Sequence, residues 1–158
     1  MTASPLVFEG VSAPAYELRV RHFGLADDSF EVWQIPNAST PNLTGPRRIG
    51  GLRGRNLGLV EHRVRRRLAE VGVRPVSVEG EFGPIPLTED IALTLGLLFR
   101  VLAPMRSRER MRAVAEGIEA MGREEAAYWL GMAMHRSNPR RVLNALRVLL
   151  TSPDHKSA

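Results

Sequence analysis

The sequence contains no cysteine and only one lysine among its 158 residues. The absence of cysteine excludes disulfide scaffolds, thiolate zinc sites, iron–sulfur clusters and cysteine nucleophiles. No apolar run reaches membrane-spanning length without charges, and Met1 to Pro14 lacks a basic stretch followed by an apolar run. These absences predict a cytoplasmic protein with no membrane partner and no secretory signal.

The sequence motifs of common enzymes are missing as well. It has no Walker loop, no dinucleotide-binding glycine pattern and no Gly-x-Ser-x-Gly nucleophile elbow. Its four histidines are scattered, and no His-x-x-x-His or Glu-x-x-His pair places two ligands on one helix face. We therefore expect no catalytic residue, no metal and no cofactor.

Arginine is abundant by contrast, and it carries nearly all of the positive charge behind a net charge of +5. Its planar guanidinium suits phosphate and carboxylate recognition better than an ammonium does. The length is that of one domain, and a content of 44% hydrophobic residues is enough for a core. We expect a flexible N-terminus at 1–14, a single α+β domain at 15–151 and a frayed tail at 152–158.

The first part of the domain, residues 15–87, is expected to be rich in strands. Tyr16–Arg21 alternates apolar and charged residues, Phe30–Trp33 resumes the alternation after a turn, and together they predict a β-hairpin. Residues 36–46 are rich in Pro, Asn, Ser and Thr and predict an irregular connection. Residues 47–55 are interpreted as a glycine-rich basic loop.

Further elements are expected between this loop and the second part of the domain. An apolar stripe predicts a helix over residues 57–71, with Gly72 placed to end it. Residues 73–78 predict a short strand, and residues 80–86 a loop.

The second part, residues 88–151, changes to helical patterns. Thr88 is a predicted N-cap, and residues 91–102 are apolar nearly all round, which predicts a helix at the buried centre of the domain. Ser107 caps a third helix, residues 123–136 form a fourth, and Asn138-Pro139 opens a fifth. The fold class is α+β: a small N-terminal antiparallel sheet with one helix, packed on a C-terminal bundle of about four helices.

Three groups of arginines are candidates for contacting phosphate or nucleic acid, in the glycine-rich loop, on the polar face of the first helix and near the last helix. These candidates are Arg47, Arg48, Arg53, Arg55, Arg63, Arg65, Arg66, Arg67, Arg136, Arg140, Arg141 and Arg147. The alternative for each group is an ordinary connection or a solvated helix face with local carboxylate partners. Contact with a polyanion requires that these guanidinium groups gather into one outward patch.

One helix carries an arrangement that resembles a catalytic site. Glu124, Tyr128 and His135 lie on one stripe of the fourth helix, with Gly131 between them. His135 stands more than two turns from Glu124, too far for a direct hydrogen bond. The alternative is the polar edge of a helix, with Gly131 admitting a neighbouring helix closely.

Two distinctive segments resemble a known group of sequences. They run from Thr88 to Pro104 and from Gly117 to Val142, and the second includes Tyr128-Trp129-Leu130-Gly131-Met132 and Arg136-Ser137-Asn138-Pro139. This half, residues 88–151, resembles an uncharacterised family of small bacterial proteins associated with anti-phage defence gene clusters. The resemblance implies a helper that acts beside helicases, nucleases or methylases, and it implies no catalytic residue.

The sequence favours a non-enzymatic accessory subunit that binds a larger protein partner and contacts DNA or RNA through its arginine-rich faces. The first alternative is a protein-interaction or self-assembly module that does not contact nucleic acid. Such a module could form homo-oligomers. An enzyme that uses Glu124, Tyr128 and His135 is the second.

Overall fold

The computed structural model describes residues 14–21, 29–53, 66, 69–70, 72, 81–135 and 139–151. The expected strand at 73–78 and tail at 152–158 lie outside this part of the chain. Of the helix expected at 57–71, only Arg66, Ala69 and Glu70 are described, and Gly72 after it has a φ of +81°.

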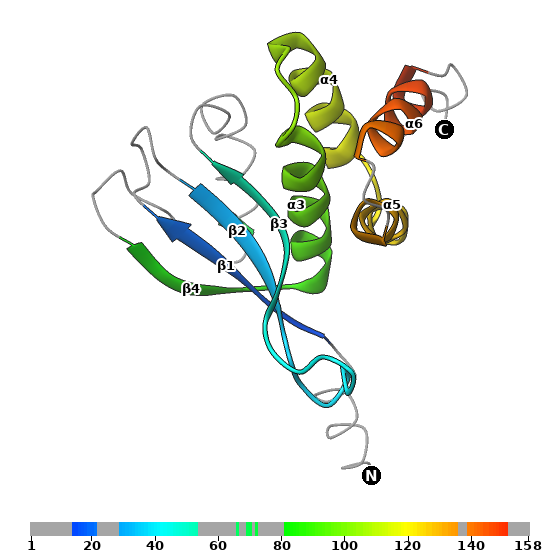
Figure 1. Cartoon of the computed structure of the whole chain (residues 1–158). Helices are drawn as coiled ribbons and strands as arrows, with labels where there is room; N and C mark the ends of the chain where they lie inside the picture. The colour runs from blue at the N-terminus through cyan, green and yellow to red at the C-terminus, as the bar shows by residue number, and fades with distance from the viewer. Residues whose placement is uncertain are drawn as a thin grey trace.

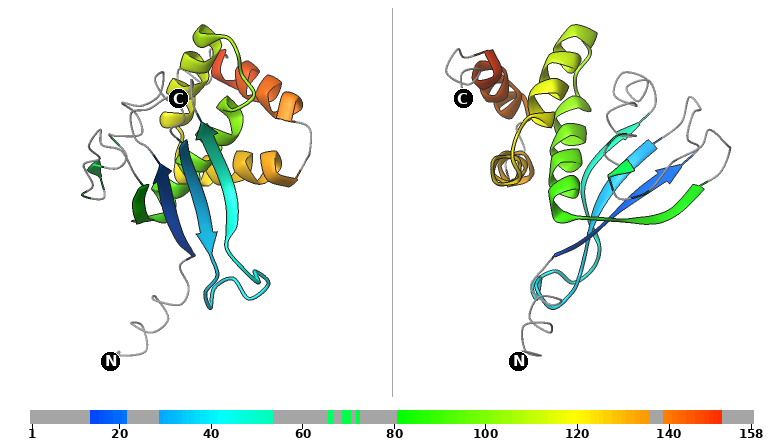
Figure 2. Two further views of the ribbon diagram at one scale, coloured as in Figure 1. Left: turned by 60° about the vertical axis from the view of Figure 1, so that its left-hand side comes forward. Right: turned by 180° about the vertical axis from the view of Figure 1, so that it is seen from behind.

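An antiparallel sheet forms one layer of the molecule (Figure 1). Within the described residues its strand order is β3-β2-β1-β4. The strands are β1 (Ala15–Arg21), β2 (Ser29–Ile35), β3 (Arg47–Arg53) and β4 (Glu81–Leu87). Helices lie on one side of this sheet, as the two further views in Figure 2 also show. The α+β class expected from the sequence is therefore confirmed.

The predicted hairpin is formed by β1 and β2, which pair antiparallel from Ala15 opposite Ile35 to Arg21 opposite Ser29. Alternation decides which residues face the helices. Leu18 and Val32 have no exposed surface, whereas their neighbours along each strand are partly exposed. The irregular connection expected at residues 36–46 is confirmed, since it contains turns and bends but no strand or helix.

The interpretation of residues 47–55 as a loop was wrong, because Arg47–Arg53 form strand β3. The strand pairs with β2, and a bulge places Val32 opposite Gly50 but Trp33 opposite Arg48. The extra residue, Ile49, breaks the alternation that would have identified a strand, so Ile49 and Gly50 are both buried. Burial of these apolar positions against the helices is what holds the segment in the sheet.

The loop expected at residues 80–86 was also wrong, because Glu81–Leu87 form strand β4. Ile85 and Leu87 are buried, whereas Pro84 and Pro86, each of which directly precedes one of them, are exposed. Prolines lack the N–H that a central strand needs. They are tolerated here because, in the described sheet, β4 pairs only with β1 and forms its edge.

Helix α3 (Glu89–Leu102) is the centre of the domain, as its apolar sequence predicted. Thr88 caps it by accepting a hydrogen bond from the backbone N–H of Ile91 at 3.3 Å. The sheet packs on one side of α3, and the remaining helices pack on the other (Figure 1). Sandwiched in this way, α3 buries every residue from Ile91 to Phe99.

Backbone meets backbone where α3 crosses β3. A Cβ atom built on Gly50 would lie 3.1 Å from the Cα of Gly96 and closer still to its carbonyl oxygen. A Cβ on Gly96 would lie 3.0 Å from the Cδ1 of Ile49. These two glycines therefore set the distance between helix and sheet.

Three further helices complete the described fold: α4 (Arg108–Glu119), α5 (Arg123–His135) and α6 (Pro139–Thr151). Ser107 caps α4 by accepting from the backbone N–H of Arg110 at 3.3 Å, as predicted. The apolar stripe of α4 is buried, and α6 packs against both α4 and α5. No helix in the described part of the chain is long and apolar enough to cross a membrane.

Candidate functional site

A groove of about 480 Å³ lies between the start of α4 and one face of α6. We call it the arginine groove. It is lined by Pro104, Met105, Arg106, Ser107, Arg110, Arg140, Asn144 and Arg147. Four of these eight residues are arginines, and no carboxylate is among them. The groove is therefore a concentration of positive charge.

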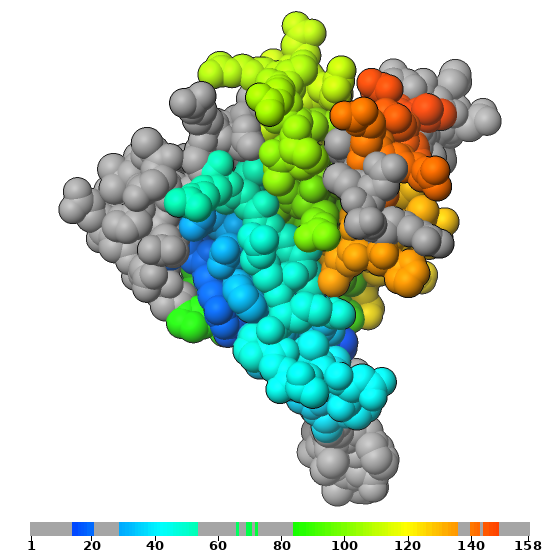
Figure 3. All heavy atoms as spheres, viewed as in Figure 1, coloured from blue at the N-terminus to red at the C-terminus, as the bar shows by residue number. Residues whose placement is uncertain are grey.

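Local structure explains how these side chains meet. The turn after α3 brings Arg106 to the surface, and the Ser107 cap starts α4 so that Arg110 falls in its first turn. Arg140, Asn144 and Arg147 follow one another at helical spacing on one face of α6. Because α6 packs beside α4, the two sets of side chains border one space. In Figure 3, α4 and α6 both reach the surface at the same end of the molecule.

Two neutral side chains in the arginine groove add polar groups. The Nη2 of Arg147 donates to the Oδ1 of Asn144 at 3.1 Å, which orients the guanidinium and leaves the amide N–H groups of Asn144 as donors. The hydroxyl oxygen of Ser107 is engaged by the backbone of Arg110, and its O–H remains a donor. Donors thus predominate over acceptors, which suits an anion.

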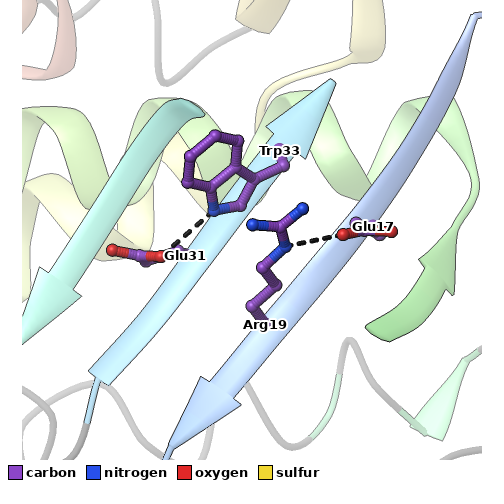
Figure 4. A network of polar contacts seen from close by, with 4 residues as sticks. All are labelled: Glu17, Arg19, Glu31 and Trp33. Atoms are coloured by element: carbon purple, nitrogen blue, oxygen red, sulfur yellow. Dashed lines mark hydrogen bonds and ion pairs between the residues drawn. The ribbon is translucent and has the colours of Figure 1, made fainter. Parts of the chain in front are cut away.

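Some arginines elsewhere in the described structure have carboxylate partners. On the sheet face opposite α3, the Nε of Arg19 donates to Glu17 at 2.6 Å and its guanidinium lies 4.2 Å from the centre of the Trp33 ring. The Nε1 of Trp33 donates to Glu31 at 3.1 Å, and Arg48 lies 3.6 Å from the other oxygen of Glu31. Figure 4 shows the first four of these residues side by side. Within this cluster each of the two arginines has a glutamate partner.

The candidate arginines of the former loop lie on β3. Arg47, Arg48 and Arg53 are all exposed. Arg47 donates to the Oε1 of Gln34 at 2.6 Å, and Arg48 pairs with Glu31. The sheet and α6 lie on opposite sides of α3 (Figure 1), so these arginines do not join the arginine groove.

The first helix contributes one described candidate, Arg66, which forms an ion pair with Glu119 of α4. The hydrogen bond to Glu119, and then the charge of Glu119, raise the pKa of Arg66 above its ordinary value. This guanidinium serves a contact within the chain. The remaining candidates of this group and two others lie outside the described residues: Arg55, Arg63, Arg65, Arg67 and Arg136.

The expectation that the candidate arginines gather into one patch was wrong for the described residues, because β3 and α6 lie on opposite sides of α3 and Arg66 pairs with Glu119. Only candidates of the last helix share a groove. Arg140 and Arg147 line the arginine groove, and Arg141 is exposed on the same helix without lining it. Arg106 and Arg110 also line the groove and were not among the predicted residues. The sequence carried a signal, since Arg106 and Arg110 flank a predicted cap four residues apart. It carried no sign that α6 would pack beside them.

The three residues of the catalytic alternative are all exposed on α5: Glu124, Tyr128 and His135. Tyr128 is 61% exposed, and its ring forms a T-shaped contact with that of Trp129, with 5.3 Å between the ring centroids. None of the three lines the arginine groove. The expectation that Gly131 admits a neighbouring helix was wrong, because no described atom lies within 4 Å of a Cβ built there.

Two observations complete the description of titratable groups. Among the described residues, no three histidine or carboxylate side chains gather in a way that could hold a metal ion. Burial raises the pKa of Tyr16 above its ordinary 10.0, against the opposing charges of Arg47 and Arg123. Arg123 is itself paired with Glu89 at the start of α3.

Fold and site together define a small α+β domain, a sheet covered by helices, with one arginine-lined groove among its described features. The chain belongs to the family described as "Domain of unknown function (DUF7680)", whose sequence model matches residues 16–152. The match covers the sheet as well as the helices. Comparison with curated proteins finds no match, and comparison with solved structures finds none.

Proposed function

We propose that this chain is a non-enzymatic binding subunit that contacts nucleic-acid phosphates through the arginine groove. The observation that carries the proposal is that four arginines, and no carboxylate, are among the described residues that line one groove. Guanidinium groups donate in a fork that matches two phosphate oxygens, and such charge-assisted hydrogen bonds are stronger than neutral ones.

The distribution of charge supports the same proposal. Arg19, Arg48 and Arg123 each have a carboxylate partner within the described structure. If these arginines served solubility alone, we would expect them to be interspersed with carboxylates, and four of them would not share one concave surface. A site that neutralises phosphates displaces bound cations from the nucleic acid, so its binding weakens steeply with salt.

Fluorescence anisotropy with labelled single-stranded and double-stranded DNA and RNA, at several salt concentrations, tests this function. We expect binding in low salt that weakens as salt rises. Arg110→Gln and Arg140→Gln each remove one phosphate contact. Each therefore makes the negative slope of log K against log salt shallower by about 1. Both side chains are exposed, so the fold tolerates the change.

Arg112→Gln is the matched control, because it removes the same charge from an exposed position of α4 outside the groove. We expect its salt slope to equal that of the unchanged protein. Absence of binding at the lowest salt would contradict the proposal, and so would equal losses in Arg112→Gln and Arg110→Gln.

We further propose that the subunit works beside a larger protein of an anti-phage defence complex. This part is supported by the resemblance of residues 88–151 alone. Purification of the chain from its native host tests it, since helicases, nucleases or methylases are expected among the proteins that come with it. Recovery of the chain alone would count against an accessory role.

A protein-interaction module without nucleic-acid contact is the second candidate. It is favoured by Tyr128 and Val148, which are 61% and 68% exposed on α5 and α6. Tyrosine is enriched among the residues that carry binding energy at protein interfaces, whereas valine adds apolar surface only. Light scattering after size exclusion would support it by showing a stable oligomer that ignores added nucleic acid.

A further inference from the structure

We infer that the arginine groove takes a phosphomonoester, the terminal phosphate of a nucleic acid or of a mononucleotide, rather than the phosphodiesters within a strand. This inference rests on the proposed contact with nucleic acid and specifies which phosphate is bound. It follows from how charge, donors and shape are arranged around the groove.

The first argument is charge. Four guanidinium groups border one volume, and no carboxylate is among the eight described residues that line it. A phosphodiester carries a single negative charge, whereas a phosphomonoester carries about −1.5 to −2 at pH 7 because its second pKa is about 6. The more highly charged group gains more from several guanidinium groups around it.

The second argument is the number of acceptors. Each guanidinium has five N–H donors, and the lining adds the hydroxyl of Ser107 and the amide of Asn144. A phosphodiester offers two unesterified oxygens. A phosphomonoester offers three, which fan outward and can accept from donors on several sides. A convergent set of donors therefore suits a monoester better.

The third argument is shape. A protein that follows a polynucleotide backbone presents a row of cations along a groove or helix. Here four arginines share one volume, whereas the described arginines on β3 lie across α3 and Arg123 is paired with Glu89, so these do not continue the groove. Guanidinium groups around one volume suit a single terminal phosphate better than a continuous strand.

Size and lining fit such a ligand. A volume of about 480 Å³ lies within the range of roughly 300–1,000 Å³ that small-molecule sites occupy. It admits a phosphate together with its sugar and base. Pro104 and Met105 supply the apolar part of the lining, against which a sugar or base can pack.

The test compares one single-stranded oligonucleotide with a 5′-phosphate and with a 5′-hydroxyl, each labelled at the 3′ end and measured by anisotropy. We expect the phosphorylated form to bind about 10-fold more tightly, since hydrogen bonds to a charged group are among the strong ones. Arg140→Gln lowers this ratio towards 1, and the control Arg112→Gln leaves it unchanged. Circular dichroism confirms that both variants are folded.

The outcomes separate this inference from the proposed function. Equal binding of both forms, weakened equally by Arg140→Gln, would overturn the inference and leave the nucleic-acid function standing. No binding of either form at low salt would overturn both. Competition with adenosine monophosphate identifies the source of the phosphate, because displacement at concentrations that match the oligonucleotide's own affinity points to a mononucleotide, and weak displacement points to a strand end.

Discussion

Substitution of Gly50 by alanine tests the close approach of β3 to α3. A Cβ at this position would lie 3.1 Å from both the Cα and the carbonyl carbon of Gly96, and nearer still to the carbonyl oxygen. All three are backbone atoms of a helix buried on both sides, so strand and helix must move apart. Overpacking of this kind costs roughly 1–3 kcal/mol. The loss of a glycine from the unfolded chain offsets about 0.4–1 kcal/mol of that cost.

Thermal and urea denaturation followed by circular dichroism measure the effect. For a domain of this size about 1 kcal/mol corresponds to roughly 2–4 °C, so we expect Tm to fall by several degrees. Gly96→Ala should cost less, because its Cβ meets the flexible Cδ1 of Ile49 at 3.0 Å and because alanine favours a helix. Gly45→Ala is the control, since no described atom lies within 4 Å of its Cβ. If Gly50→Ala were as stable as Gly45→Ala, the packing described for β3 and α3 would be wrong.

Three further predictions concern stability. Gly131→Ala on the exposed side of α5 should raise the free energy of unfolding by roughly 0.5–1 kcal/mol. A lower free energy of unfolding in urea denaturation would contradict the open space described around Gly131. Because burial raises the pKa of Tyr16 in the folded state, its contribution is fully present below the unfolded value of 10.0 and is lost as pH rises above it. Tyr16→Phe should therefore flatten the alkaline fall in stability, and an unchanged slope would contradict this assignment. Arg19→Gln removes the cation over Trp33 and the ion pair with Glu17, so we expect a loss of about 0.5–1 kcal/mol together with altered tryptophan fluorescence; an unaltered emission spectrum would mean that Arg19 does not cover the ring in solution.

Elements whose residues follow one simple rule could be predicted from the sequence. The hairpin of β1 and β2 follows strict alternation, and helix α3 follows from a capped apolar run. The caps at Thr88 and Ser107 are short-range hydrogen bonds that a sequence displays directly.

The two edge strands could not be predicted because tertiary contacts override their local chemistry. A bulge and the approach of Gly96 give β3 two adjacent buried residues, Ile49 and Gly50, where alternation would allow one. Strand β4 carries prolines that only an edge position tolerates, and edge position is a property of the whole sheet.

Two of the four arginines in the candidate site could be predicted from the sequence. Arg140 and Arg147 share one face of α6, which helical spacing shows. Arg106 and Arg110 enter the site through the packing of α6 beside α4, and no spacing within either helix indicates that contact. Convergence of charge from separate elements is a tertiary property.

The most direct test of the central claim, that the arginine groove binds phosphate, is an NMR titration of the arginine Nε–Hε signals with a 5′-phosphorylated oligonucleotide. We predict that the signals of Arg106, Arg110, Arg140 and Arg147 shift first and saturate together, while those of Arg19 and Arg48, held by carboxylates on the sheet, stay in place. Shifts that begin on the sheet, or that spread evenly over all arginines, would contradict the claim.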